Sequence, residues 1–355
     1  IAIKGVGGYH LVCDAENSKS IEKLRARKHR PHKPLAVMFP MRGEDGLDMV
    51  RRHTRPSLTE REAISSPARP IVLVRRSQDS TLSPELATGL AELGVFLPYS
   101  PLHHRLLEAF GKPVVATSGN LSGEPVLTGN EEAETRLSDI CDHFLQHNRP
   151  IVRPADDPVV RVIAQRPRLI RPGRGIAPLE FQLPEGTSLE PMIATGGHMK
   201  NTVALAWANR LVVSPHIGEL DSPRSLDIFN NVIKDLQDLY NVNANYIACD
   251  LHPGYASSRW AREQAGKVIQ VQHHHAHASA LAGEHPDISS WLIFAWDGVG
   301  FGADGTLWGG EALHGSPGHW QRLASFRPFS LVGGDKAGRE PWRSAAALQW
   351  AEELD

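Results

Sequence analysis

Apolar residues recur at helical spacing in the middle of the chain, at Leu226, Phe229, Ile233, Leu236 and Tyr240. This spacing predicts an amphipathic helix with one face in a core. Strand-like runs and further helix-like stretches surround it. The runs are Thr202–Trp207, Leu211–Pro215, Tyr246–Cys249 and Trp291–Trp296, and the stretches are Tyr255–Ala265 and Ala276–Glu284. Strand and helix patterns therefore alternate, which favours a layered α/β domain.

The first half of the chain shows related patterning. We predict a helix at Ile21–Lys28 and strands at Leu35–Phe39, Pro113–Thr117 and Val159–Ala164. A stretch rich in Pro, Gly and Ser, LPEGTSLEP, then separates a segment dense in Arg and Lys from one dense in Gly, His and Asp. We therefore expect one domain at residues 1–183, a linker at 184–190 and a second domain at 191–355.

Composition limits the class of protein. The 355 residues are 41% hydrophobic and 22% charged, which is enough for two domains that each bury a core. A net charge of −2 provides no overall basic field and argues weakly against a nucleic-acid partner. We expect no membrane span, because no apolar run approaches the roughly 20 residues that a spanning helix needs.

Three cysteines, Cys13, Cys141 and Cys249, are far apart and odd in number, so neither a disulfide framework nor a cysteine-rich zinc site is indicated. A reducing compartment fits best, and we expect a cytoplasmic protein. The chain begins at Ile1 and ends in a predicted helix, Arg339–Leu354. We therefore expect a fragment of a longer protein.

Basic residues cluster in the turn RKHRPHKPLAVMF, where Lys28, Arg30 and Lys33 lie around two prolines that stiffen the backbone. Such a turn could hold a phosphate. The plainer interpretation is a solvated basic loop, because that is the commoner fate of a charge run. The same cluster, taken as Arg25–Lys33, leaves open a non-catalytic RNA-binding scaffold.

Two further motifs strengthen the phosphate interpretation. In SGNLSGEP, Ser118 and Asn120 flank a tight turn after a predicted strand, with Ser122 and Gly123 as further turn residues. Hydroxyl and amide groups at a strand end suit hydrogen bonds to a polyphosphate or a small acid. The motif RLIRPGRG supplies two guanidinium groups, whose forked geometry matches phosphate and carboxylate oxygens, at Arg171 and Arg174. Together the three motifs predict an anion cleft.

A turn at Gly196–Gly197 precedes Lys200 and Asn201 in ATGGHMKN. Glycines there would let backbone N–H groups approach phosphates, and the two side chains could assist. An ordinary tight turn is the commoner explanation of the same residues.

The pentapeptide HHHAH, His273–His277, is the strongest chemical signal in the chain. His273 and His277 are four residues apart and would share one helical face, which is half of a divalent-metal site. Asp297, at the end of an apolar run, is a candidate carboxylate ligand. Helix capping or a surface cluster is the alternative. A zinc protease of the HExxH type is excluded, because His274 stands where that motif has Glu.

The first segment resembles the YrdC-like domain family, through KxRPxxKPLA at Lys28–Ala36, ATSGNLSGEP at Ala116–Pro125 and IRPG at Ile170–Gly173. The resemblance implies an open twisted α/β fold that makes an acyl adenylate from ATP and a carbonate-derived acyl group. It also implies that the nucleotide cleft is lined by Lys28, Arg30, Lys33, Ser118, Asn120, Arg171 and Arg174. The opening KGVGGYHL departs from the tRNA-modifying members and looks like the hydrogenase-maturation carbamoyltransferases, HypF, and we expect its Lys4 to bind the nucleotide.

The second segment resembles the actin-like ATPase (ribonuclease H-like) branch that contains TsaD and the O-carbamoyltransferases. The matching motifs are ATGGHMKN, CDLHPGYASS, VQHHHAHASA and WDGVGFGADGTLWGGE. The resemblance implies that His273 and His277 ligate a metal, and that Asp297 and Gly298 belong to its phosphate-side loop. It places Asp250 and His252 near the acceptor or transfer path. We expect a first lobe only, without the second lobe, the acylphosphatase domain and the zinc fingers of HypF.

These resemblances imply a carbamoyltransferase of nickel–iron hydrogenase maturation. Its substrates would be ATP, with Mg²⁺, and carbamate derived from carbamoyl phosphate, and its acceptor would be the C-terminal Cys thiol of HypE. The catalytic set would include Lys28, Arg30, Ser118, Asn120 and His252. The second metal would be Zn²⁺ or iron, because imidazole and carboxylate suit both. The tRNA threonylcarbamoyladenosine enzymes, which share both modules, remain an alternative.

Overall fold

The computed structural model describes residues 1–121, 123–334 and 336–353. Ser122, which we predicted to be a turn residue, and Leu354, the predicted end of the last helix, lie outside this description. The chain forms two compact units. The first unit contains Ile1–Gln182, His198–Leu205 and Arg210–Val242, and the second contains Leu183–Gly197, Ala206–Asn209 and Asn243–Asp355.

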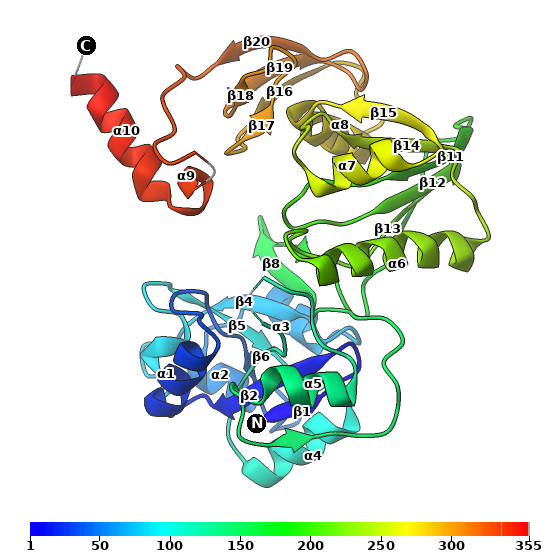
Figure 1. Ribbon diagram of the computed structural model, residues 1–355. Coiled ribbons are helices and arrows are strands. Elements are labelled where there is room, and N and C mark those ends of the chain that lie inside the picture. The colour runs from blue at the N-terminus through cyan, green and yellow to red at the C-terminus, as the bar shows by residue number, and fades with distance from the viewer. Residues whose placement is uncertain (122, 335, 354–355) are drawn as a thin grey trace. The chain divides into compact units, whose positions relative to one another are not determined.

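Among the described residues of the first unit, nine strands form one mixed sheet in the order β7-β1-β2-β6-β3-β5-β4-β8-β9 (Figure 1). Apolar and β-branched residues dominate its central strands, as in IVLVR of β4 and VVATS of β6, because such residues pack well on a pleated surface. The strands are β1 (Ala2–Lys4), β2 (Tyr9–Asp14), β3 (Val37–Met38), β4 (Ile71–Arg75), β5 (Glu92–Phe96), β6 (Val114–Ser118), β7 (Phe144–Leu145), β8 (Val159–Ile163) and β9 (Arg166–Arg171).

Helices of the first unit begin and end at recognisable capping residues. Asn17 caps α1, Ser100 caps α4 and Ser222 caps α6, each by accepting a hydrogen bond from a backbone N–H of the first turn. Gly111, with φ of 77°, ends α4 in the left-handed region that glycine adopts without strain. The helices are α1 (Ser18–Arg27), α2 (Asp48–His53), α3 (Leu58–Ser65), α4 (Pro101–Phe110), α5 (Asn130–Leu137) and α6 (Pro223–Tyr240), with a 3₁₀ helix at Pro84–Leu86.

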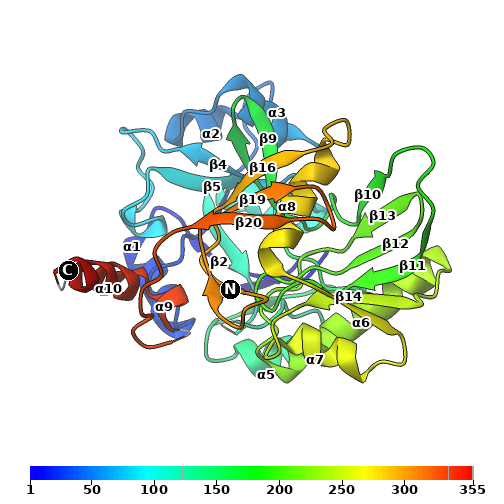
Figure 2. The same ribbon diagram turned by 90° about the horizontal axis from the view of Figure 1, so that it is seen from above.

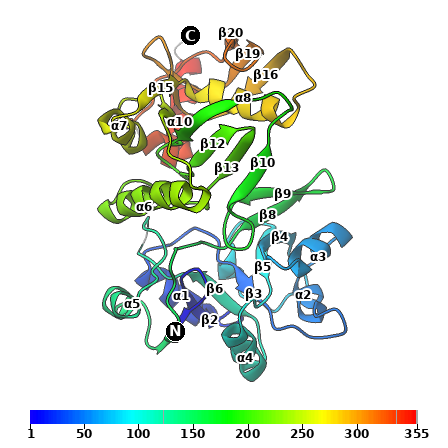
Figure 3. The ribbon, with the colours of Figure 1, turned by 90° about the vertical axis from the view of Figure 1, so that its right-hand side faces the viewer.

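The edge of this sheet ends in the β8–β9 hairpin, next to β4 (Figure 3). The IRPG motif begins in the last two residues of β9 and continues into the turn that follows, so the hairpin supports one wall of the predicted anion cleft. The first unit also contains the antiparallel pair β10 (Leu179–Gln182) and β13 (Arg210–Val213). β12 (Ala204–Ala208) is divided between the two units.

The second unit has a parallel layer in which β14 (Tyr246–Asp250) lies between β11 (Leu189–Ala194) and β15 (Lys267–Val271). Helix α7 (Ala256–Glu263) packs on β14, and α8 (His273–Glu284) follows β15. Because β14 and β15 are parallel, their carboxyl ends meet at one edge, where Asp250 and the histidines of α8 lie.

An antiparallel sheet of β16 (Trp291–Ala295), β19 (Glu311–Gly315) and β20 (Gln321–Ser325) covers one side of α8 (Figure 2). Alternation along β16 places Ile293 in a core with Ala278 and Ala282 of α8, and exposes Phe294. The remaining elements are β17 (Gly300–Phe301), β18 (Leu307–Trp308), α9 (Lys336–Arg339) and α10 (Pro341–Glu353).

The structure confirms the predicted alternation of strands and helices but corrects several boundaries. The predicted helix Ala276–Glu284 begins three residues earlier, at His273, because Gln272 accepts a hydrogen bond from the His275 N–H as its N-cap. The predicted strand Leu35–Phe39 is paired only at Val37–Met38. Among the described residues, none of the helices combines the length and the apolar character that a membrane crossing requires.

Candidate active site

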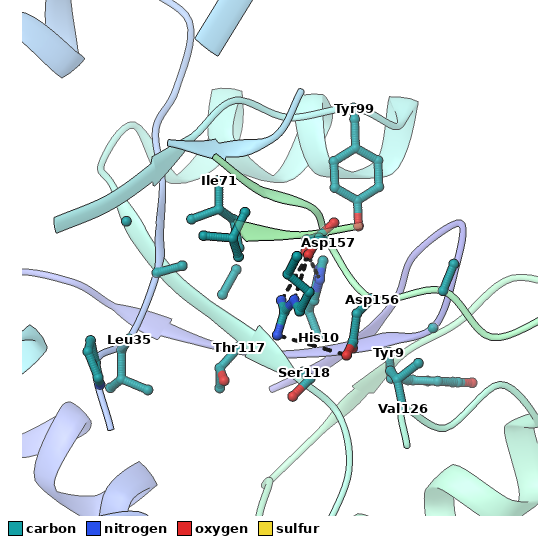
Figure 4. Close-up of a pocket in the computed structure, with 18 of the residues that line it drawn as sticks. Tyr9, His10, Leu35, Ile71, Tyr99, Thr117, Ser118, Val126, Asp156 and Asp157 are labelled. Carbon is teal, nitrogen blue, oxygen red and sulfur yellow. Dashed lines mark hydrogen bonds and ion pairs between the residues drawn. The ribbon is translucent and has the colours of Figure 1, made fainter. Parts of the chain in front are cut away.

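A pocket of about 190 Å³ in the first unit brings together three of the segments predicted to form the anion cleft. Arg30 comes from the basic turn after α1, Ser118 from the end of β6 and Arg171 from the end of β9. Figure 4 shows His10, Thr117, Ser118, Asp156 and Asp157 around this pocket. The apolar part of its lining includes Leu35, Ala36, Ile71, Leu73, Ala116, Val126 and Val159. A pocket with apolar walls and a few convergent polar groups is typical of small-ligand sites.

Lys28 does not line this pocket but holds its wall. The ammonium group donates to the carbonyl oxygen of Ser118, to that of Asn120 at 2.9 Å and to Asn120 Oδ1 at 2.7 Å. Only 4% of the Lys28 side chain and backbone is exposed, and burial, followed by the charge of Arg30, lowers the pKa of Lys28 to about 7. Lys28 and Asn120 therefore join the basic turn to the SGN turn.

Arg30 is the member of the basic turn that faces the pocket. It donates to Thr117 Oγ1 at 3.1 Å and to the Pro34 carbonyl at 2.9 Å, and burial lowers the pKa of Arg30 to about 10. Lys33 is exposed and does not line the pocket. Arg25 is buried and donates to the carbonyl oxygens of Arg30, Pro31 and Lys33. Arg25 therefore shapes the basic turn from within and does not present a surface for nucleic acid.

The two arginines of the IRPG region have different environments. Arg171 lines the pocket and donates from Nε and Nη2 to the Asp157 carbonyl at 3.1 and 2.8 Å. Arg174 is instead enclosed: it pairs with Asp157 Oδ1 at 3.1 Å, lies 3.3 Å from the Tyr99 ring centroid and donates to the Ala68 and Arg69 carbonyls. Arg174 thus stabilises the wall and does not line the pocket.

Lys4 lies at a separate point. Its ammonium donates to Asn130 Oδ1 at 2.7 Å and to the His147 carbonyl at 3.2 Å, and the residue is buried. It does not line the pocket, so its predicted role in nucleotide binding gains no geometric support from the pocket.

Sequence reasoning missed an acidic pair and a histidine at the pocket. Asp156 and Asp157 both line it, and His10 Nε2 lies 2.8 Å from Asp157 Oδ2. Burial opposes ionisation of Asp157, but His10 and Arg174 lower its pKa below the usual range, so it is a carboxylate. Burial also raises the pKa of Tyr99, a further lining residue, well above its usual value. The adjacent acids in ADDP, just before a strand, were the available signal.

The three residues of the expected metal site lie close together in the second unit. His273 Nε2 lies 2.8 Å and His277 Nε2 lies 3.5 Å from Asp297 Oδ2. The ring centroids of the two histidines are 4.9 Å apart, and one ligand atom from each of the three residues lies within 4.8 Å of the others. His273 and His277 share one face because one helical turn separates them.

Asp250 completes this cluster from the end of β14. Its Oδ2 lies 2.6 Å from His273 Nδ1, the ring nitrogen that faces away from Asp297. Hydrogen bonds to Asp250 and Asp297 raise the pKa of His273 to about 9, and the same pairs lower the pKa of Asp297. A carboxylate that orients a histidine from behind is the usual outer partner of a metal-ligating imidazole. The donor set, two imidazoles and a carboxylate, therefore fits a divalent cation such as zinc or iron.

The other predicted residues of the second half of the chain have mixed positions. Gly196 and Gly197 line a pocket together with Asp250, His273 and His277. His252 stacks on Tyr255, with ring centroids 4.1 Å apart, and the His252 backbone N–H donates to Asp250 Oδ1. Gly298 is exposed, and its N–H donates to Asp297 Oδ1. In the first unit, Lys200 is exposed, whereas Asn201 is buried and exchanges backbone hydrogen bonds with Gly218.

Three family models match consecutive parts of the chain. The Sua5/YciO/YrdC model, described as "Telomere recombination", matches residues 1–173. The model of the HypF Kae1-like domain matches residues 187–284, and that of the second subdomain of the carbamoyltransferase Kae1-like domain matches 293–355. The third match begins inside the stretch 191–355, which we treated above as one lobe.

Curated relatives give the same result over the whole chain. A carbamoyltransferase HypF of Synechocystis is 47% identical over 351 residues, which are 99% of this chain and 45% of the relative. That of Rhodobacter capsulatus is 44% identical and aligns with 97% of this chain and 46% of its own. The chain belongs to the HypF carbamoyltransferase family. It spans about half the length of the curated HypF proteins that it matches.

Solved HypF structures have the same fold. A crystal structure of full-length HypF in the phosphate- and nucleotide-bound form matches with a TM-score of 0.92 at 36% identity, covering 98% of this chain and 54% of that one. The structure of HypF from T. kodakarensis matches with a TM-score of 0.91 at 35% identity, covering 98% of this chain and 45% of that one. This chain therefore has a YrdC-like part and a Kae1-like, actin-like ATPase part, as the motifs predicted.

Proposed function

We propose that this chain carries the two chemical modules of a HypF-type carbamoyltransferase. The first joins carbamate, derived from carbamoyl phosphate, to ATP. The second passes the carbamoyl group to the C-terminal Cys thiol of HypE during nickel–iron hydrogenase maturation. The observation that carries the proposal is the convergence of Arg30, Ser118 and Arg171 on one pocket. Support also comes from the solved HypF relative, which was crystallised in a phosphate- and nucleotide-bound form.

In the first step, a carboxylate oxygen of carbamate attacks the α-phosphorus of ATP, and pyrophosphate leaves. Negative charge builds up on the phosphoryl oxygens, and fixed cationic donors stabilise it without reorganising. Arg30 and Arg171 are suited to this role, because each is held by protein hydrogen bonds beside the pocket. Mg²⁺ would accompany ATP as part of the substrate.

In the second step, the thiolate of the acceptor attacks the carbonyl carbon of carbamoyl adenylate, and AMP leaves. We propose that His273, His277 and Asp297 hold a divalent metal, zinc or iron, with Asp250 orienting His273. When bound, such a cation would supply positive charge for nucleotide phosphates. Gly196 and Gly197, which line the same pocket, would let backbone N–H groups approach the nucleotide. His252 would stand near the transfer path.

Carbamate-dependent exchange of labelled pyrophosphate into ATP tests the first step. The full chain should exchange label when ammonium and bicarbonate supply carbamate, and Arg30→Ala and Ser118→Ala should each lower the rate at least about 10-fold. Matched controls are Arg105→Ala and Ser138→Ala, because both residues are exposed and neither lines the pocket. Equal rates in all five proteins would show that the adenylation site lies elsewhere.

Adding threonine discriminates the alternative. A threonylcarbamoyl-AMP synthase of Pseudoalteromonas translucida is 28% identical over 138 residues. The product named for that enzyme contains threonine, so its synthesis requires threonine. Exchange that requires threonine would favour that alternative. Exchange that proceeds with carbamate alone, followed by a mass increase of one carbamoyl group on HypE, supports the carbamoyltransferase.

A further inference from the structure

The pocket of the first unit contains two ionised groups of the wrong sign for a phosphate site, Asp156 and Asp157. Asp156 lines it together with Arg30 and Arg171. Its Oδ2 lies 3.6 Å from His216 Nδ1 and 3.9 Å from Arg171 Nη1, both longer than a normal hydrogen bond of about 2.7–3.2 Å. Burial opposes its ionisation, but His216 and Arg171 lower the pKa of Asp156, so it is a carboxylate at neutral pH.

Its neighbour Asp157 has a different role, although it lines the same pocket. Both oxygens of Asp157 are engaged, Oδ2 with His10 at 2.8 Å and Oδ1 with Arg174 at 3.1 Å. Its carbonyl oxygen also holds Arg171. Asp157 therefore has a structural role. Asp156 is the acid whose carboxylate oxygens remain able to accept hydrogen bonds from a ligand.

The backbone around Asp156 is held on both sides. The backbone N–H of Ala155 donates to the carbonyl oxygen of Gly7 at 2.8 Å, and the carbonyl oxygen of Asp156 accepts from the backbone N–H of Arg174 at 2.8 Å. Glycine is required at position 173, because a Cβ there would lie 2.3 Å from the Asp156 carbonyl oxygen. Two loops thus fix the backbone from which the Asp156 side chain enters the pocket. A carboxylate held in this way is suited to recognising a ligand.

An ionised carboxylate repels phosphate oxygens, so its partner in an occupied pocket should carry hydrogen-bond donors. Of the substrates of the proposed reaction, carbamate combines a carboxylate, which suits Arg30 and Arg171, with an amino group that has two N–H donors. We propose that Asp156 accepts a hydrogen bond from the amino group of carbamate and thereby selects carbamate over other small carboxylates. This inference rests on the proposed function, because it assigns the acid that the adenylating pocket uses.

Acetate provides the test, because a methyl group replaces the amino group of carbamate while the carboxylate is kept. In pyrophosphate exchange by the full chain, the KM for carbamate and the inhibition constant of acetate give a selectivity ratio. Removing the charge of Asp156 changes repulsion of both anions alike, so this effect cancels in the ratio. Losing the hydrogen-bond acceptor weakens the binding of carbamate alone. Asp156→Ala should lower the ratio roughly 10- to 100-fold, as expected for a hydrogen bond to a charged group.

Asp156→Asn, which keeps the shape and a weaker acceptor, should lower the ratio by less, and it is the reserve variant if the alanine protein does not fold. Asp79→Asn, at an exposed acid, should leave the ratio unchanged. If exchange persists with an unaltered ratio in the Asp156 variants, the inference is overturned while the proposed function stands. A higher Mg²⁺ requirement with an unaltered ratio would overturn it too, in favour of a metal-binding role. Absence of carbamate-dependent exchange in the parent chain would instead overturn the proposed function.

Discussion

Arg25 and Arg27 provide a matched pair of substitutions on one helix. Both lie in the last turn of α1, two residues apart. Arg25 is buried and donates to the carbonyl oxygens of Glu85, at 2.7 and 3.0 Å, and of Arg30, at 2.9 Å, besides those of Pro31, Lys33 and Leu86. Arg27 instead pairs with Asp142 at the surface, where half of the carboxylate side chain is exposed. Both substitutions therefore replace a guanidinium by an amide, Arg25→Gln at a buried position and Arg27→Gln at the surface.

The structure sets the expected size of the Arg25 effect. Pro31 and Lys33 are exposed, so water can replace the guanidinium at their carbonyl oxygens, and Leu86 retains a hydrogen bond from the Leu35 N–H. This leaves the carbonyls of Glu85 and Arg30, each of which loses a hydrogen bond that contributes roughly 1.5–3 kcal/mol from a charged donor. Releasing the arginine from its buried site offsets part of this loss. We expect Arg25→Gln to lower the free energy of unfolding by about 2–4 kcal/mol.

Tryptophan placement makes the assay specific to one unit. All eight tryptophans of the chain lie in the second unit, at positions 207 and beyond. Circular dichroism reports unfolding of both units, whereas tryptophan fluorescence reports the second. In urea, Arg25→Gln should shift a circular-dichroism transition strongly, and Arg27→Gln should shift it little, because exposed ion pairs contribute little. Equal shifts in the two variants would refute the assignment of Arg25 as the internal support of the basic turn.

Two further predictions concern the histidines. His273→Ala and Asp297→Ala should abolish tight Zn²⁺ or Fe²⁺ binding in equilibrium dialysis. Asp250→Asn should weaken this binding by about 10- to 100-fold, because Asp250 orients a ligand from behind, whereas the control His275→Ala, on the same helix, should leave binding unchanged. Unchanged binding in every variant would exclude the cluster as a metal site. In the first unit, burial lowers the pKa of His103 to about 3, so between about pH 3 and 6.5 the unfolded chain binds a proton that the folded chain does not. Stability should therefore fall as the pH falls through this window, by up to about 1.4 kcal/mol per pH unit. In urea titrations at several pH values, His103→Gln should flatten the dependence of the free energy of unfolding on pH. The control His104→Gln, at an exposed position, should leave this dependence unchanged. Identical slopes of unfolding free energy against pH in the two variants would contradict the prediction.

Local sequence predicted which segments carry chemistry but assigned side chains within a motif less well. The three motifs around Arg30, Ser118 and Arg171 were predicted to converge, and they line one pocket. Lys28 and Arg174, from the same motifs, instead hold the walls. Their direction depends on which carbonyl and carboxylate oxygens lie behind the turn, and those oxygens come from residues such as Asn120 and Asp157 elsewhere in the chain.

The histidine site was more predictable, because its geometry is mostly local. His273 and His277 share a face by helical periodicity alone, and the apolar run before Asp297 marks that residue as the end of a strand. Asp250 behind His273 depends on the parallel pairing of β14 and β15, which brings the end of one strand beside the start of the helix that follows the other. Spacing along the chain contains no information about that register.

By itself the sequence determined the alternating α/β elements, the basic and polar turns that line the pocket of the first unit and the histidine pair, because each follows from periodicity or from residue chemistry over a few positions. Only the tertiary structure decided that Arg25 and Arg174 face inward and that Asp156 enters the anion pocket beside Asp157. Burial and charge pairing depend on distances between residues far apart in the chain. Those distances exist only once the sheets have formed.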